Sequence, residues 1–253
     1  MFHPDYERPS TGPHEFIGVE TEGQPIPMGS CVIGIRYDKG VLIAADTAVS
    51  EASVPRYQDV DRVYKINKQI IMGGGGNFHD VQMYRRTIER QVISDRIYQD
   101  AFEMKAKALA CWLRNTLCAR RMAMEPTNVA LIVGGMQPNE GPYLSLIDSA
   151  ESISDDYVAA TGPSRQLVIS MVRDKKPQER DFTETEALGM IRTCMGKLQC
   201  RDPCAITQYT VGVCNANECH IEGPYKVNED WTLARRKKGE QATKNIISNS
   251  STI

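Results

Sequence analysis

The chain has 253 residues, a formal net charge of -2 and an isoelectric point near 6.1. This length suits one large domain, and the near-neutral charge gives no basic field that would favour nucleic acid. No apolar window approaches the ~20 residues of a membrane-spanning helix. Residues 1–17 lack the basic start and apolar run of a secretory signal. These observations favour a soluble globular protein whose partners must be argued from local features.

Residues 1–29 are expected to form an N-terminal arm. Five prolines and scattered Gly, Ser and Thr interrupt this stretch, and no helical or strand period continues through it. Its composition leaves three alternatives open: a docking strap, a removable pro-segment or a disordered tail.

The next stretch, residues 30–46, predicts a β-hairpin. Two Val- and Ile-rich runs flank residues 38–40, a Gly-containing connection that is typical of hairpins. The first run follows Gly29 and Ser30 directly. Cleavage between these two residues would give Ser30 both a hydroxyl and a free α-amine, and a nucleophile of that kind can carry its own base.

A second hairpin is predicted over residues 63–72, and it leads into four glycines at 73–76. A phosphate-binding loop would need Lys and Ser or Thr after the last glycine, whereas Asn77 and Phe78 follow here. We therefore expect the glycines to present their backbone to a pocket or to a neighbouring element.

Two helices are predicted next, over residues 80–98 and 102–122. The expected apolar stripe of the second helix consists of Ala108, Cys111, Trp112, Asn115 and Cys118. Two consecutive long helices favour an antiparallel pair on one face of a sheet.

Strands and a second helix pair complete the pattern. Strands are predicted at residues 129–133, 143–147, 157–160, 208–214 and 218–221, and helices at 163–173 and from Thr183 to Leu198. Thr183 and Glu186 form a capping box, which marks the start of the last helix. Hairpins that separate pairs of helices predict an α+β fold with two stacked antiparallel sheets between two helical layers. The expected core spans residues 30–223, and residues 224–253 form a C-terminal extension.

The chain has eight cysteines, which are scattered through these patterns and favour reduced thiols in an intracellular compartment. A late cluster comprises Cys200, Cys204, Cys214, Cys219 and His220. Its cysteine pairs are separated by three and four intervening residues, instead of the two that are typical of a zinc knuckle. Core or edge thiols are therefore favoured over a metal site.

Four features carry a resemblance to a known family: the order of the elements, the hairpin that ends in Asp46, the glycine run 73–76, and the pair Arg201 and Asp202. In these features the sequence resembles the β subunits of the proteasome core particle. These proteins are N-terminal nucleophile hydrolases. The resemblance covers residues 29–221 and implies the four-layer αββα sandwich of that family.

The resemblance also implies where a catalytic site would lie. In active members a threonine freed at the chain start attacks the peptide carbonyl, and Ser30 holds that position here. Asp46 matches an acidic residue that orients a lysine, but Arg62 holds the lysine position. Gly76 retains the glycine whose amide serves the oxyanion hole.

The remaining positions depart further from the family. Pro163 falls at a family serine, although a shift of one residue would place Ser164 there. Asp202 is retained, whereas Ala205 replaces a second serine. Because catalytic groups of this kind act as a unit and a guanidinium is always charged, we interpret the site as vestigial and the chain as a non-catalytic subunit.

Two catalytic alternatives remain open. An active peptidase that uses Ser30 would require cleavage between Gly29 and Ser30, whereas the resemblance suggests processing upstream, near Thr21. The second alternative is a free-standing homo-oligomeric peptidase, which would form a ring of identical chains.

The C-terminal pattern from Ile221 to Ala234 resembles a non-catalytic subgroup of the family, whose tail reaches toward the opposite β ring. The candidate tail residues are Trp231, Arg235, Arg236, Lys237 and Lys238. Inter-subunit contact, nuclear import and a solvated tail are the alternatives for this basic cluster. The resemblance implies beta type-1 and beta type-6 neighbours in the ring, contacts with the opposite β ring and the α ring, and residence in the cytoplasm and nucleus. It implies no cofactor, no metal, no nucleic-acid partner and no association with a membrane.

Overall fold

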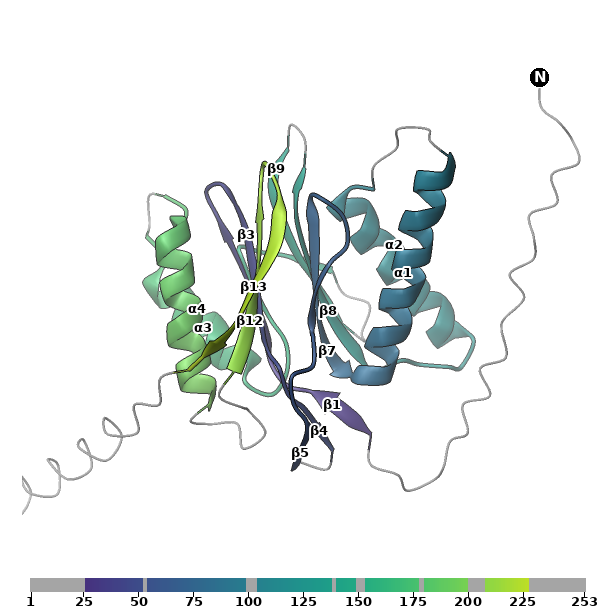
Figure 1. The fold of residues 1–253 in the computed structure, drawn as a ribbon, viewed down its shortest axis with the longest axis horizontal. Helices are drawn as coiled ribbons and strands as arrows, with labels where there is room; N and C mark the ends of the chain where they lie inside the picture. Colours follow the sequence, from purple (N-terminus) through teal and green to yellow (C-terminus); the bar gives the residue numbers. More distant parts are fainter. Residues whose placement is uncertain are drawn as a thin grey trace, which may run out of the picture.

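The structure is a computed structural model that describes residues 26–51, 54–98, 104–137, 140–148, 153–177, 180–199 and 208–227. Its elements stack as four layers, with two antiparallel sheets between two pairs of helices (Figure 1). The predicted α+β fold of four layers is confirmed.

The first sheet has eight strands, in the order β10-β9-β8-β7-β1-β4-β5 with β6 paired to β7. These strands are β1 (Pro27–Gly29), β4 (Val49–Glu51), β5 (Val54–Tyr57), β6 (Val63–Lys65), β7 (Ile70–Asn77), β8 (Val129–Gln137), β9 (Gly141–Ile147) and β10 (Ile153–Asp155). Strands β1, β4 and β5 lie at one end of the sandwich, beyond the helical layers (Figure 1).

The second sheet has five strands in the order β11-β2-β3-β12-β13. Its members are β2 (Val32–Tyr37), β3 (Gly40–Asp46), β11 (Val158–Ala160), β12 (Gln208–Asn215) and β13 (Cys219–Lys226). Strands β2 and β3 form the predicted hairpin, in the register Val32 to Ala45 through Tyr37 to Gly40. Nearly every residue of the two strands is buried, which explains why they are continuous apolar runs.

Helices cover the outer face of each sheet. Helices α1 (Phe78–Tyr98) and α2 (Ala106–Met122) pack on β7, β8 and β9, and α3 (Arg165–Lys175) and α4 (Glu184–Gln199) pack on β2, β3 and β11. One apolar cluster fills each of the three spaces between the four layers. The two sheets thus divide the apolar core into three separate clusters.

The capping box at the start of α4 is confirmed. The backbone N–H of Thr183 donates to Glu186 at 2.9 Å, and the N–H of Glu186 donates to the Thr183 hydroxyl at 3.4 Å. The two bonds satisfy donors that a helix start leaves unpaired.

The expected apolar stripe of α2 is wrong at three of its five positions, whereas Trp112 packs against the apolar cluster under the helix. Ala108, Cys111 and Asn115 are exposed. The buried residues are instead Ala106, Leu109, Ala110, Leu113 and Leu117. The helix is rotated so that the leucines meet the sheet, because they remove more apolar area from water than alanine and cysteine do.

Three further differences concern the ends of elements. The last residues of the expected arm form β1, and β13 continues to Lys226. The four glycines at 73–76 are part of β7, which continues beyond the predicted end of the hairpin at residue 72. A Cβ on Gly73 would lie 2.5 Å from Cγ1 of Val32, so that the backbone of one sheet packs directly against side chains of the other, as expected of a glycine wall.

The expectation of reduced thiols is wrong for Cys214 and Cys219, which are joined by a disulfide. The two residues lie opposite each other in the antiparallel pair β12–β13, with their Cα atoms 4.1 Å apart. Strand pairing across the hairpin thus brings the two sulfur atoms together. Cys200 and Cys204 lie outside the described residues.

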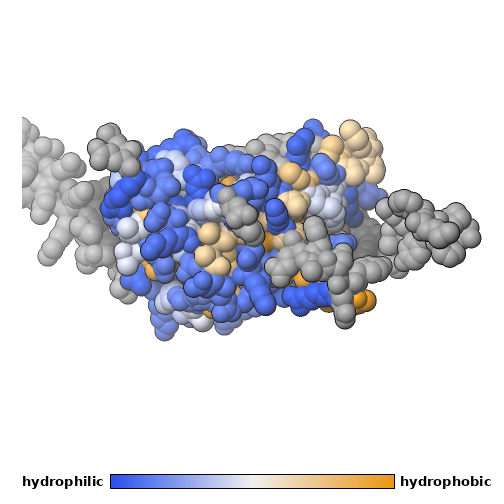
Figure 2. Space-filling view, turned by 90° about the horizontal axis from the view of Figure 1, so that it is seen from above, coloured by the Kyte–Doolittle hydropathy of each residue, from blue (hydrophilic) through white to orange (hydrophobic). Residues whose placement is uncertain are grey.

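The surface seen from above is mostly hydrophilic, with small separate apolar patches (Figure 2). In the described part of the chain, no helix is both long and apolar enough to cross a bilayer. Four of the exposed large apolar side chains, Ile26, Met28, Val54 and Tyr57, belong to β1, to β5 or to the residue before β1.

Candidate functional site

Arg62 lies directly before β6, and its side chain is wholly buried. Two hydrogen bonds hold it against β7. The N–H of Gly74 donates to the Arg62 carbonyl at 2.9 Å, and Nε of Arg62 donates to the Gly74 carbonyl at 3.2 Å. Both the main chain and the side chain of Arg62 are therefore fixed to one residue of the glycine run.

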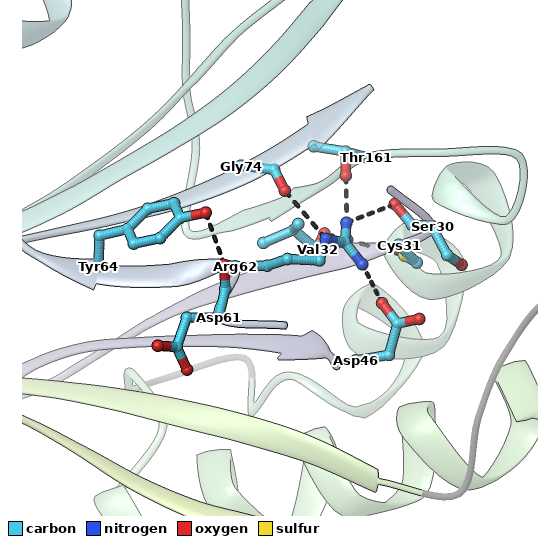
Figure 3. Close-up of polar contacts among 9 residues, drawn as sticks. All are labelled: Ser30, Cys31, Val32, Asp46, Asp61, Arg62, Tyr64, Gly74 and Thr161. Atoms are coloured by element: carbon cyan, nitrogen blue, oxygen red, sulfur yellow. Dashed lines mark hydrogen bonds and ion pairs between the residues drawn. The ribbon is translucent and has the colours of Figure 1, made fainter. Parts of the chain in front are cut away.

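The outer nitrogens of the guanidinium reach two other strand ends (Figure 3). Nη1 forms an ion pair with Asp46, the last residue of β3, whose side chain is only 4% exposed. Nη2 donates to the backbone carbonyl of Ser30 at 2.9 Å. The guanidinium is thus bonded at all three nitrogens, as a buried charge must be paired and hydrogen-bonded to be tolerated.

Gly29 provides the space for this arrangement. A Cβ atom on Gly29 would lie 2.8 Å from both Nε and Nη2 of Arg62 and 2.9 Å from Cζ. Only glycine leaves room for the guanidinium against the backbone here. The residue before Ser30 is thereby part of the buried site.

Strand β1 fills the space between two other strands of its sheet. Met28 and Gly29 pair with Ser50 and Val49 of β4 on one side, and with Asn77 and Gly76 of β7 on the other. An extended peptide could add to either strand in the absence of β1, because open strand edges bind such peptides. The chain's own segment takes that place.

Thr161 closes the other side of the site. Its hydroxyl accepts a hydrogen bond from the N–H of Val32 at 3.0 Å, and its own N–H donates to the Val32 carbonyl at 2.9 Å. A Cβ on Gly75 would lie 2.7 Å from this hydroxyl oxygen. Thr161 thus joins the start of β2 to the glycine run.

Comparison with known proteins identifies the family. A profile described as "Proteasome subunit" matches residues 26–214. The chain belongs to the proteasome subunit family.

Several proteasome subunits are similar to the chain over most of their length. Proteasome subunit beta type-4 of Drosophila melanogaster is 49% identical over 211 residues, which cover 83% of this chain and 79% of the relative. Beta type-4 of Xenopus laevis is 26% identical over 215 residues, or 85% and 88% of the two chains. Proteasome subunit beta type-7 of Saccharomyces cerevisiae is 26% identical over 226 residues, or 85% of each chain. The similarities support a beta type-4 subunit.

The proteasome fold brings several of the predicted site residues together. Ser30, Asp46 and Arg62 are in mutual contact through the guanidinium. Gly76, in β7 with a φ of 86°, lies opposite Gly29. The backbone amide of Gly76, to which the family resemblance assigns an oxyanion-hole role, therefore belongs to the residue that pairs with β1.

Pro163 and Ser164 lie in the turn that precedes α3. Pro163 is exposed, and Ser164 is the N-cap residue of α3, without a capping hydrogen bond from its side chain. Gly162, with a φ of 80°, brings this turn close to the site, since its Cβ would lie 3.3 Å from the Ser30 carbonyl oxygen. Which of the two residues occupies the family's serine position stays a prediction.

The other predicted positions lie outside the described residues. They are Asp202 and Ala205 of the site, and Trp231, Arg235, Arg236, Lys237 and Lys238 of the tail.

Sequence reasoning missed Gly29 and Thr161 as members of the site. The sequence indicated Gly29 and Ser30 as a possible cleavage site. It did not indicate that Gly29 also leaves the space in which the guanidinium of Arg62 packs against the backbone. Thr161 gave no signal beyond its place at the end of an apolar run.

Proposed function

We propose that the chain is a non-catalytic structural β subunit of the proteasome core particle. The observation that carries the proposal is the guanidinium of Arg62, which is buried between Asp46, Ser30 and Gly74 at the position where the family resemblance places a lysine.

A guanidinium cannot replace the lysine chemically. An ammonium group can exchange or tune a proton next to a nucleophile, whereas arginine stays protonated at every accessible pH. The donors of Arg62 are already used in binding the carboxylate of Asp46 and two carbonyl groups. The residue therefore supports the architecture of the site and no proton relay.

Strand β1 supports the same conclusion. While residues 27–29 remain attached, the nitrogen of Ser30 is part of a peptide bond and cannot act as a free amine. The pairing of β1 with β4 and β7 also leaves no open strand edge beside Gly76 for an extended substrate.

The role that remains is assembly. The subunit completes the β ring, with beta type-1 and beta type-6 subunits as neighbours and the α ring above. Its tail from Trp231 through Lys238 helps to join the two β rings. The particle degrades proteins in the ATP- and ubiquitin-dependent pathway, in the cytoplasm and nucleus. Neither a cofactor nor a metal takes part.

A mechanism-based probe tests the absence of catalysis. Purified core particles are treated with a β-lactone or a fluorophosphonate, and the labelled chains are identified by mass spectrometry. The catalytic subunits of the same particles serve as the positive control, and this chain is expected to stay unlabelled. Labelling on Ser30 that disappears in Ser30→Ala particles would establish the alternative, an active peptidase.

A further inference from the structure

A small pocket of about 260 Å³ lies between α4 and the β12–β13 hairpin. Its lining residues are Arg192, Gly196, Tyr209, Tyr225, Lys226 and Val227. None of them belongs to the site described above. Small-molecule sites usually measure about 300–1,000 Å³, so that this pocket fits one or two side chains better than a cofactor.

One wall of the pocket is aromatic. The rings of Tyr209 and Tyr225 lie 5.7 Å apart at an angle of 39°. The hydroxyl of Tyr225 donates to Glu222 at 2.6 Å, which fixes its ring. Such a wall suits a flat apolar group, because aromatic pairs prefer offset or tilted contacts at this spacing.

The rim of the pocket is cationic. Arg192 and Lys226 are both exposed, and neither forms an ion pair with a carboxylate in the described part of the chain. Burial raises the pKa of Tyr209, and the nearby Arg192 cation opposes that shift. The pocket therefore offers two positive charges beside its aromatic wall.

We propose that residues 228–231 of this same chain occupy the pocket, with the Trp231 indole against the tyrosines and Glu229 and Asp230 beside the two cations. Val227, the last described residue, is itself part of the lining. Four extended residues span about 14 Å, so that Trp231 is within reach. The sequence Asn-Glu-Asp-Trp brings the two charges and the aromatic ring that complement the pocket.

The proposed docking fixes the point at which the C-terminal extension leaves the subunit. Residues 228–231, with the acidic pair Glu229 and Asp230, bind in cis, whereas the basic cluster that begins at Arg235 is left for other contacts. The inference does not need the absence of catalysis. It assigns Trp231 to its own chain, so that any ring-joining contacts of the tail would begin after this residue, at the basic cluster.

A photo-crosslinker at position 231 tests the docking in assembled core particles. Benzoylphenylalanine replaces Trp231, and the particles are irradiated and analysed on denaturing gels and by peptide mass spectrometry. We expect cross-links to residues 192–199 or 208–227 of the same chain, which then migrates at the mass of a single chain. A cross-link to another subunit, or none, would overturn the proposal.

Charge variants refine the experiment. Combined Arg192→Glu and Lys226→Glu should lower the yield of the internal cross-link about tenfold, since two exposed ion pairs are lost. Adding Glu229→Lys and Asp230→Lys should restore it. Lys197→Glu changes a charge of the same sign on α4 outside the pocket lining and serves as the matched control, with an unchanged yield expected. An equal loss in the control would also count against the proposal.

An engineered disulfide provides a second measurement if the charge variants fail to assemble. Gly196→Cys and Trp231→Cys should join within one chain under mild oxidation, because the Gly196 position faces the pocket next to Val227. Free thiols at both positions after oxidation would contradict the docking.

Discussion

The guanidinium of Arg62 lies directly against the backbone of Gly29, where a Cβ atom would come within 2.8 Å of two of its nitrogens. Arg62 and the glycine before Ser30 are therefore one structural unit. The pair explains how a large buried cation fits a site that is closed by the chain's own strand.

Gly29→Ala should displace Arg62 and weaken its contacts with Asp46 and Ser30. We expect a loss of about 1–3 kcal/mol in the free energy of unfolding, as is usual for overpacking in a tight site. Urea unfolding of the purified full chain measures it. Gly189→Ala, in α4 with nothing within 4 Å of the new Cβ, is the control and should be neutral or slightly stabilising. Equal stability of both variants would refute the contact.

The ion pair between Asp46 and Arg62 should show strong coupling. Asp46→Asn or Arg62→Met alone leaves one buried partner unmatched and should cost about 3–5 kcal/mol, whereas the double variant should cost clearly less than the sum. Unfolding free energies of the four chains give the coupling. Arg173→Ala, which breaks an exposed pair with Asp156, should cost at most about 1 kcal/mol. Additive losses at Asp46 and Arg62 would contradict the pairing.

The start of α4 should be sensitive to acid. Hydrogen bonds from Arg180 and the Thr183 backbone amide lower the pKa of Glu186 from 4.5 to about 2. Because the carboxylate form is favoured in the folded state, its stabilising effect is present above pH 4.5 and is lost as the pH falls toward 2.

Glu186→Gln tests this pH dependence. The variant should be less stable than the parent chain at neutral pH, and the difference should shrink below pH 4.5, as followed by urea unfolding at a series of pH values. Glu140→Gln, in the exposed turn before β9, is the control for the loss of a surface carboxylate and should leave stability at neutral pH unchanged. A difference that grows on acidification would show the opposite linkage.

Removal of the N-terminal arm separates the effect of β1 on the reactivity of Ser30 from the effect of Arg62. A chain that begins at Ser30, made by cleavage of an N-terminal ubiquitin fusion, has a free amine and lacks β1. We expect it to stay unreactive toward a β-lactone, because the guanidinium of Arg62 remains at the position where the family resemblance places a lysine. The full-length chain is the control for background labelling. Labelling that Ser30→Ala abolishes would show that the arm alone suppresses catalysis.

Local sequence signals predicted much of the fold. The β2–β3 hairpin and the capping box of α4 depend on residues close together in the chain, and both are confirmed. The stripe of α2 could not be chosen in this way, because its leucines and its small residues both repeat at helical spacing. The sheet against which the helix packs decides between them.

The candidate site was only partly predictable. The residue types at Ser30, Asp46 and Arg62 suggested a lost proton relay, and the structure brings the three together. Strand β1 was missed because its partners in β4 and β7 are about 20 and 50 residues away, and because Pro25 and Pro27 suggest an irregular arm. Proline is nevertheless compatible with the first residue of a strand, where Pro27 lies.

The N-terminus of the mature chain tests the central claim most directly. Core particles are purified from the native source, and the intact mass and N-terminal peptide of this subunit are determined. We expect a chain that begins upstream of Pro27, so that β1 is retained and the Ser30 nitrogen stays in a peptide bond. A mature chain that begins at Ser30 would contradict it.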